Sequence, residues 1–157
     1  MSTVERGARV RFPPPLVFLL CAAIGLGLRY AVVPAHVPVD VVVRVALGVL
    51  VQASGVALVA SARILFHRTG QNPVPWTPTP ELIASGPYRF TRNPMYLGIT
   101  VFLVGLGVTL DDLWISLFAG PALLVVHFIA VRPEEEYLRA KFGEPYERYL
   151  ARVRRYL

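Results

Sequence analysis

Four long apolar runs divide this chain and leave it few folds outside a lipid bilayer. The runs cover 16–33, 41–66, 95–110 and 113–131. Three of them are close to or above the roughly 20 residues that a helix needs to cross the hydrocarbon core. With 55% hydrophobic residues and a mean hydropathy of +0.53, the chain is also too apolar for an ordinary soluble domain. The sequence predicts an all-α integral membrane protein with four transmembrane helices, forming one domain over residues 1–157.

Basic residues gather on one side of this predicted topology. Most lie in 1–15, 63–94 or 132–157, whereas the connections 34–40 and 111–112 carry acids and no Lys or Arg. Lys and Arg mark cytoplasmic loops, so we expect an inner or plasma membrane protein with cytoplasmic N- and C-termini. The net charge of +6 is explained by topology. No basic surface with interleaved aromatic residues is apparent, so no nucleic-acid partner is expected.

Two segments outside the runs stand out on the cytoplasmic side. Residues 1–15 form a basic arm that ends in three consecutive prolines, and residues 67–93 form a long cytoplasmic loop. Repeated prolines exclude a continuous helix in that loop. Long loops in compact chains are often functional, and the apolar residues Trp76, Leu82 and Ile83 favour an ordered one. We expect the loop to fold over a site.

The charged tail, residues 132–157, predicts two short cytoplasmic helices. Pro133 and Pro145 each suit a first helical position, although Pro133 could also turn the chain, and Gly143 suits the stop between the helices. An apolar stripe in the second helix opposes arginines, which predicts that this helix lies on the anionic leaflet. The stripe consists of Tyr146, Tyr149, Leu150, Val153 and Leu157.

Small and polar residues in the second run suit close helix packing in lipid. They are Gly48, Gln52, Ser54, Gly55 and Ser61. Gln52 could alternatively line a polar pocket. At the start of the run, Asp40 and Arg44 have the i, i+4 spacing of an ion pair. Residues 94–131 predict a tight helical hairpin, with Gly98 and Gly105 on one face of its first helix.

The segment Gly-Pro-Tyr-Arg-Phe-Thr-Arg-Asn-Pro-Met-Tyr-Leu-Gly, residues 86–98, places polar groups at the entrance of the third run. Asn93 followed by Pro94 predicts a helix cap and a first helical position. Arg92 immediately precedes that start, where free amides and the helix dipole favour an anion. A carboxylate or phosphate could therefore be held there. Arg92 could equally mark the cytoplasmic edge of a span.

Acidic residues open the tail on the same side of the membrane. The helix dipole and an i, i+4 pair between Glu135 and Arg139 explain them structurally. The predicted topology also brings Glu134 and Glu135 to the face that carries residues 86–98, where both charge signs could bind a zwitterion. His127 precedes them within the fourth run, and a polar group at that depth is a candidate site residue. No two histidines or acids have metal-ligand spacing, so no metal is expected.

Two patterns, Gly-Pro-Tyr-Arg-x-x-Arg-Asn-Pro-x-Tyr-x-Gly over 86–98 and Glu-Glu-x-x-Leu-x-x-x-Phe-Gly-x-x-Tyr-x-x-Tyr over 134–149, carry a resemblance to a known family. They resemble the isoprenylcysteine carboxyl methyltransferase family and its phospholipid methyltransferase relatives, over about residues 60–155. The resemblance implies an S-adenosylmethionine-dependent methyltransferase whose cofactor lies between the last spans and the tail helices. It also implies a lipophilic acceptor, presenting a carboxylate, thiol or amine, that enters from the bilayer.

The resemblance further implies roles for individual residues. The element Arg92-Asn93-Pro94-x-Tyr96 matches the family's arginine-histidine-proline-x-tyrosine, and Glu134 with Glu135 matches its paired glutamates. Asparagine replaces a frequent histidine and cannot titrate near neutral pH, which leaves a catalytic role at this position open. Arg92 and Glu135 are the expected catalytic residues. The expected cofactor-binding residues are Tyr88, Arg89, Asn93, Tyr96, Gly98, His127, Glu134 and Glu135.

Two other functions remain compatible with the residues. The chain could be a non-enzymatic four-helix membrane module whose arginines and glutamates only cap helices. It could also be a relative of membrane NADPH-dependent reductases of the sterol type, although those chains are much longer. No glycine-rich phosphate loop of a soluble nucleotide fold is present.

Overall fold

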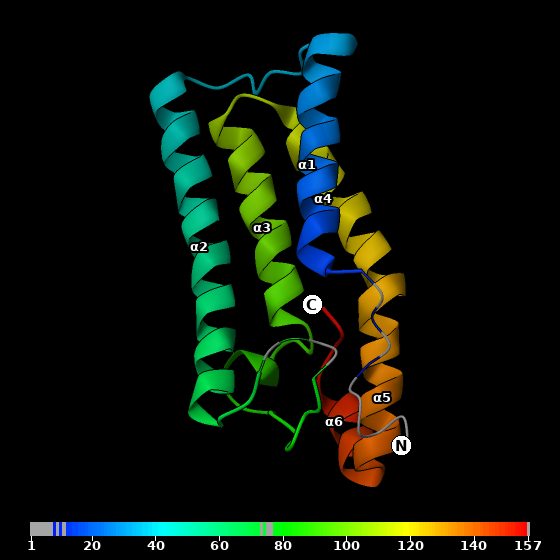
Figure 1. Ribbon diagram of the computed structural model, residues 1–157. Coiled ribbons are helices and arrows are strands. Elements are labelled where there is room, and N and C mark those ends of the chain that lie inside the picture. Colours follow the sequence, from blue (N-terminus) through cyan, green and yellow to red (C-terminus); the bar gives the residue numbers. More distant parts are fainter. Residues whose placement is uncertain (1–7, 9, 11, 73, 75–76, 157) are drawn as a thin grey trace.

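The computed structural model describes residues 8, 10, 12–72, 74 and 77–156. The described chain is helical, with no strand beyond an isolated bridge between Thr91 and Arg154. Figure 1 shows the arrangement of the helices. In chain order they are α1 (Pro14–Ala31), α2 (Val41–Arg68), the 3₁₀ turn η2 (Gly86–Arg89), α3 (Pro94–Thr109), α4 (Leu113–Val126), the π-helix η3 (His127–Val131), α5 (Arg132–Phe142) and α6 (Glu144–Arg152).

Three helical stretches of the described chain are long and apolar enough to cross a bilayer. They are α1, α2 and the uninterrupted run from Leu113 to Phe142, whose apolar part is α4 with η3. Helix α3 is also apolar but has 16 residues. The predicted all-α membrane fold is therefore confirmed, whereas a fourth full span at α3 stays a prediction. The observed helix starts lie within two residues of those predicted for the four runs, and so do the ends of α1, α2 and α3, whereas the fourth helix continues past residue 131 to Phe142.

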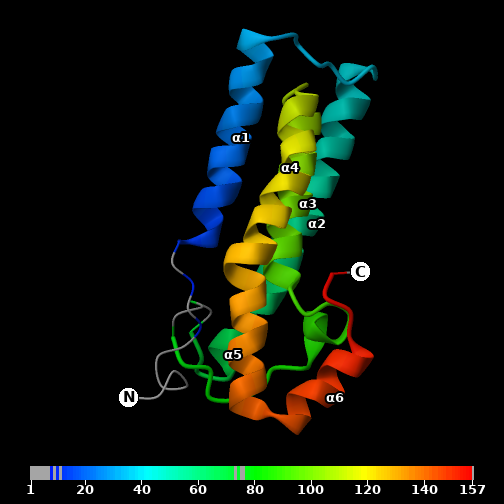
Figure 2. The ribbon, with the colours of Figure 1, turned by 90° about the vertical axis from the view of Figure 1, so that its right-hand side faces the viewer.

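The four long helices do not pack in chain order. Helix α2 packs on α3, α3 packs on α4, and α4 packs on α1, while α1 and α2 flank the bundle (Figures 1 and 2). The α1–α2 connection therefore crosses over the α3–α4 turn. Two backbone contacts fasten this crossing: Leu113 donates to the Ala35 carbonyl at 2.9 Å, and Val37 donates to Asp111 Oδ1 at 2.9 Å.

Glycines bring the α2 and α3 backbones into direct contact. A Cβ added at Gly55 would lie 2.5 Å from the Gly98 carbonyl oxygen, and one at Gly105 would lie 2.7 Å from the Gly48 carbonyl oxygen. Such close approach is typical of helices that associate in lipid through small residues. Gln52 takes part in this packing by donating to Thr109 Oγ1 at 2.6 Å. We call the contact through these four glycines the glycine seam.

Asp111 organises the end of the bundle where the crossing lies. Its carboxylate contacts His36 Nδ1 at 2.7 Å and Arg44 Nη1 at 3.4 Å. The predicted pair between Asp40 and Arg44 is therefore wrong, because Asp40 instead caps α2 by accepting from the amide of Val42 at 2.9 Å. Hydrogen bonds from the backbone of Val37 and from His36 hold the pKa of Asp111 below its usual value.

Helix α4 continues through η3 into α5 without a turn, so Pro133 does not redirect the chain. The amide of Arg132 donates to the His127 carbonyl, five residues earlier. A π-turn of this kind inserts one extra residue into the regular hydrogen-bond ladder. The wider turn accommodates Pro133, which has no amide to donate and whose ring would otherwise clash with the carbonyl one turn before it. The apolar span and the charged α5 therefore form one rod.

Helix α6 turns back under the bundle at Gly143, which has a φ of 57° and ends α5 as the sequence predicts. Its apolar stripe is not on a lipid surface. Tyr146, Tyr149 and Val153 are buried in the protein against Leu82 of the loop and against a set of side chains from α5 and α6. That set is Leu138, Phe142 and Leu150. Leu157 lies outside the described residues. The prediction that this helix lies on the anionic leaflet is therefore wrong, because its apolar stripe packs against other parts of the protein.

Candidate functional site

Three segments far apart in the sequence meet at the end of the bundle opposite Asp111. They are the start of α3, the charged rod of α5, and the last described residues after α6 (Figure 2). The amide of Arg92 donates to the Arg154 carbonyl at 3.0 Å, within the bridge that joins Thr91 to Arg154. We call residues 153–156 the C-terminal strap. It holds the entrance of α3 against α5.

Two arginines enclose the carboxylate of Glu135. Arg155 forms a bidentate contact with it, from Nε to Oε1 at 2.9 Å and from Nη2 to Oε2 at 2.7 Å. Arg92 Nη1 lies 3.3 Å from Oε1. The Glu135 side chain is 9% exposed and that of Arg92 is 12% exposed, so this is a largely buried ion network. The hydrogen bonds to Glu135 raise the pKa of Arg155, which keeps it cationic.

Asn93 occupies the predicted N-cap position of α3 but does not cap it with its side chain. Its Nδ2 instead donates to the Arg155 carbonyl at 3.0 Å, and Thr91 Oγ1 donates to the same oxygen at 3.1 Å. Pro94 has no amide, as predicted for a first helical position. Asn93, which the sequence predicted to cap α3, therefore bonds to the C-terminal strap instead.

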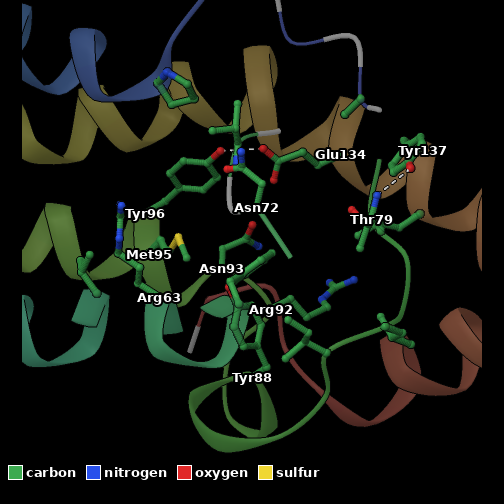
Figure 3. A pocket seen from close by; sticks show the side chains of 18 of the residues that line it. Arg63, Asn72, Thr79, Tyr88, Arg92, Asn93, Met95, Tyr96, Glu134 and Tyr137 are labelled. Atoms are coloured by element: carbon green, nitrogen blue, oxygen red, sulfur yellow. Dashed lines mark hydrogen bonds between the residues drawn. The ribbon is translucent and has the colours of Figure 1, made fainter. Parts of the chain in front are cut away.

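A largely apolar pocket opens between these segments and α2. Its cavity volume is about 410 Å³, and Figure 3 shows side chains around it. Apolar walls come from α2, α3, the loop and the prolines at the start of α1, and they include Val59, Ile83, Met95 and Ile99. The polar lining residues that bear on chemistry are Arg92, Asn93, Tyr88, Tyr96, Glu134 and Tyr149. An apolar cavity with a few convergent polar groups is the usual form of a small-molecule site.

Glu134 and Arg92 bring an ionisable carboxyl and a guanidinium to this pocket. Burial raises the pKa of Glu134 to about 7. Tyr96 donates to Glu134 Oε1 at 2.6 Å, and no described residue bonds the other oxygen, Oε2 (Figure 3). The Nε atom of Arg92 is buried and has no hydrogen-bond partner among the described residues. A buried donor without a partner costs about 1–3 kcal/mol. The pocket therefore offers an unmet donor and an unmet acceptor to a ligand.

Tyrosines on the rim stay protonated at neutral pH. Burial raises the pKa of Tyr149 to about 12, and burial together with the charge of Glu134 raises the pKa of Tyr88. Tyr149 donates its hydroxyl to the Tyr88 carbonyl at 2.8 Å, which fastens η2 to α6. These side chains supply hydrogen-bond donors and aromatic faces, and neither is poised to act as a base.

Four of the predicted site residues do not line the pocket. Glu135 is enclosed by arginines behind it, Arg89 is exposed on η2, and Gly98 belongs to the glycine seam. His127 lies on the strap side of the rod, where its Nδ1 is 3.1 Å from the Tyr156 hydroxyl. Tyr88, Asn93, Tyr96, Glu134 and Arg92 do line it. No cluster of three or more potential metal ligands occurs within the described part of the chain.

Sequence reasoning missed Arg155, Tyr156 and the pocket residue Asn72. Arg155 sits in a basic run in which neighbouring arginines look alike, so nothing local distinguishes it. Tyr156 follows the end of α6 and belongs to no periodic pattern. Asn72 follows the C-terminus of α2 in a segment that reads as loop. Only the length of that loop and its apolar residues indicated that it would cover a site.

Comparisons with known proteins identify a family. The family model described as phospholipid methyltransferase matches residues 43–145, which include most of the residues that line the pocket. The chain is 37% identical over 67 residues to an uncharacterized protein of Haemophilus influenzae, covering 40% of this chain and 100% of that protein. It is 30% identical over 64 residues to the nickel-cobalt-cadmium resistance protein NccN of Alcaligenes xylosoxydans xylosoxydans. That match covers 41% of this chain and 30% of NccN, so the chain spans less than a third of that relative.

Proposed function

The chain belongs to the phospholipid methyltransferase family, and on this premise we propose that it is an integral membrane S-adenosylmethionine-dependent methyltransferase acting on a lipophilic acceptor. Its apolar helices and its family make it a membrane methyltransferase in the broad sense. We further propose that α3 is a fourth span, that residues 1–157 act as one domain, and that both termini are cytoplasmic. The charge asymmetry of the connections supports this orientation.

The residues of the pocket fit a zwitterionic cofactor. Its amino acid part carries a carboxylate and an ammonium, which match the unmet Arg92 donor and the free oxygen of Glu134. Tyr88 and Tyr96 offer aromatic faces for a nucleoside or a cation. This pairing of Arg92 and Glu134 on one apolar cavity of about 410 Å³ is the observation that carries the proposal.

When bound, the cofactor supplies a methyl group already activated by its sulfonium sulfur. The protein therefore mainly aligns the reacting atoms and excludes water, and positioning alone supplies several kcal/mol, with about 7–11 as the upper range. The apolar walls that include Met95 and Ile99 exclude water. If the acceptor is an amine or thiol, its proton can pass to Glu134 Oε2, the carboxylate oxygen that no described residue bonds.

Glu135 is assigned a positioning role under this proposal. Its carboxylate is shared by Arg92 and Arg155 and does not line the pocket. It holds the guanidinium of Arg92, a residue that lines the pocket, in one orientation. This changes the expectation from the sequence, in which Glu135 was both a catalytic and a cofactor-binding residue.

Calorimetry with S-adenosylhomocysteine on the detergent-purified protein tests the proposal. The wild type should bind, and Glu134→Gln should weaken binding at least tenfold because an ammonium or hydroxyl loses its charged acceptor. Glu136→Gln is the matched control, since Glu136 is an exposed glutamate two positions along α5. It should bind as the wild type does.

Absence of binding in the wild type would reject the methyltransferase assignment. Equal losses in Glu134→Gln and Glu136→Gln would reject the pocket as the cofactor site. Incubation of the wild type with labelled S-adenosylmethionine and extracted membranes, followed by mass analysis of the labelled product, then identifies the acceptor.

A further inference from the structure

A second cavity lies beside the pocket, at the cytoplasmic end of α2 in the proposed orientation. Its volume is about 350 Å³, and it is lined by Arg63, His67, Gly70, Gln71 and Asn72. Arg63 and Asn72 also line the apolar pocket, so the two cavities adjoin. The main pocket is walled mostly by apolar side chains, whereas four of the five residues here carry polar side chains. A mostly apolar cavity thus adjoins a polar one.

The sequence builds this cavity by a specific helix ending. Gly70 has a φ of 65°, and its amide donates to the His67 carbonyl at 3.2 Å. The amide of Gln71 donates to the Phe66 carbonyl at 2.8 Å. This pair of bonds is a Schellman motif, for which glycine in the left-handed region is the preferred residue. It turns the chain back, so that Gln71 is buried beneath the last turn of α2.

The Gln71 side chain is buried without a hydrogen-bond partner among the described residues. The residue is 7% exposed, and neither Nε2 nor Oε1 has a hydrogen bond within the described part of the chain. Buried amides are normally bonded, and an unmet donor or acceptor costs about 1–3 kcal/mol. A methionine or leucine would fill the same space without this cost. An amide that is unpaired on both sides, lining a cavity, indicates a ligand that both accepts and donates.

The charged side chains around Gln71 indicate whether that ligand is an anion or a cation. Arg63 and His67 lie one turn apart on α2, and neither pairs with a carboxylate among the described residues. The carbonyls of the helix end, which would repel an anion, already accept hydrogen bonds at Leu65, Phe66 and His67. The cavity therefore favours an oxyanion and disfavours an ammonium group.

The depth of the cavity places it among lipid headgroups. Helix α2 has 28 residues, which gives a length of about 42 Å, against about 30 Å for the hydrocarbon core. Its last turns therefore extend into the headgroup region. Lipid phosphates lie at this level, and exposed apolar residues of α2 such as Val56 and Ile64 can contact the acyl chains.

We propose that this cavity binds the headgroup of an anionic phosphodiester lipid bearing a hydroxyl group, with the lipid's acyl chains in the bilayer beside exposed apolar residues of α2 such as Val56 and Ile64. The phosphate contacts Arg63 and His67 and accepts from the Gln71 amide. The headgroup hydroxyl donates to Gln71 Oε1. This binding requires no methyl transfer, so it stands apart from the proposed enzymatic activity.

Short-chain phosphatidylglycerol, added to the purified protein in a neutral detergent, is the probe, and native mass spectrometry measures its binding. The wild type should bind it saturably and at least tenfold more tightly than a short-chain diacylglycerol or inorganic phosphate. Arg63→Ala and Gln71→Met should each weaken binding at least tenfold. Arg68→Ala is the matched control, because Arg68 also belongs to the last turn of α2 but lines neither cavity. It should stay within twofold of the wild type.

Thermal unfolding separates a binding role for Gln71 from a structural one. Gln71→Met removes an unmet buried amide, so its apparent Tm without lipid should rise while phosphatidylglycerol binding falls. A lower Tm, equal losses in Arg63→Ala and Arg68→Ala, or equal binding of diacylglycerol or inorganic phosphate would each overturn the proposal. Binding of S-adenosylhomocysteine in the same preparation reports separately on the methyltransferase assignment.

Discussion

The two ends of the helical bundle differ in how their polar groups are satisfied. At the Asp111 end, Arg29 donates to the Leu110 carbonyl at 3.0 Å, and the indole of Trp114 donates to the Val33 carbonyl at 2.8 Å. The polar side chains named there bond to backbone carbonyls or to one another, with Asp112 Oδ2 as a buried exception. At the opposite end, Arg92 and Gln71 have buried atoms that no described residue bonds, beside two cavities.

The comparison distinguishes polar groups that stabilise the fold from polar groups that are left available to a ligand. At the Asp111 end, hydrogen bonds join the α1–α2 connection to the α3–α4 turn and so fix the order of the helices. At the site end, unmet groups lower the stability of the protein without ligand and favour binding. Substitutions at the Asp111 end should therefore change stability alone, whereas those at the site end should change affinity more than stability.

A bulky residue in the glycine seam should lower both the stability of the bundle and the affinity for ligand, and it should have the largest effect. Gly105→Leu would place its Cβ 2.7 Å from the backbone of α2 at Gln52 and Gly48, so the helices must separate. Overpacking of this kind costs about 1–3 kcal/mol and occasionally more. Gly120→Leu, at a site with open space around the Cβ, should be nearly neutral. Thermal unfolding in detergent and S-adenosylhomocysteine calorimetry measure both effects, and equal behaviour of the two variants would contradict the seam.

Loss of Arg155 should reduce affinity with a smaller effect on stability. Arg155→Ala removes the bidentate partner of Glu135, so Arg92 alone must neutralise that carboxylate and loses its fixed orientation. We expect affinity for S-adenosylhomocysteine to fall roughly tenfold, equivalent to about 1.4 kcal/mol. Arg152→Ala serves as control, because Arg152 is an exposed arginine of α6. Unchanged affinity in Arg155→Ala would show that the strap does not support the pocket.

Loss of the Asp111 carboxylate should show the opposite pattern. Asp111→Ala removes the contacts to Val37, His36 and Arg44 and places alanine at a φ of 58°, so the apparent Tm should fall by about 3–6 °C. Asparagine tolerates that backbone conformation, so Asp111→Asn should lose less. Affinity for S-adenosylhomocysteine should stay within twofold of the wild type in both. A tenfold loss would mean that the two ends are coupled.

Acid should weaken the Asp111 end by a small amount. Because the folded pKa of Asp111 is lowered, its stabilisation is present above the ordinary aspartate pKa of about 4 and is lost as pH falls through the lowered value. The Tm difference between wild type and Asp111→Asn should therefore shrink as pH falls from about 6 to about 3. Thermal scans across this range measure it, and a constant difference would contradict the role of the charge.

The helices of this fold could be predicted because their signals are local. Apolar runs set the spans, Pro94 sets the start of α3, and Gly143 sets the end of α5. The sequence did not predict the ion-pair partner of Arg44 correctly. Arg44 binds Asp111, not the aspartate one turn before it, because the chain crossing brings the distant carboxylate closer.

The site was predicted in outline for the same reason. The segment 86–98 and Glu134 reach one pocket, as topology and motif indicated. The partner of Asn93 and the burial of α6 depend on where the C-terminal strap lies, which no periodic pattern encodes. An apolar helix face indicates that it will be covered, but it does not distinguish lipid from protein.

The glycine seam also bears on how this scaffold can diversify. Because α2 and α3 meet through their backbones, the joint contains few side chains that would need repacking when a neighbour changes. Met95 and Ile99 face the cavity from α3, and Arg63 faces it from α2. Exchange of these three residues would therefore reshape the cavity without altering the four glycines through which α2 and α3 meet.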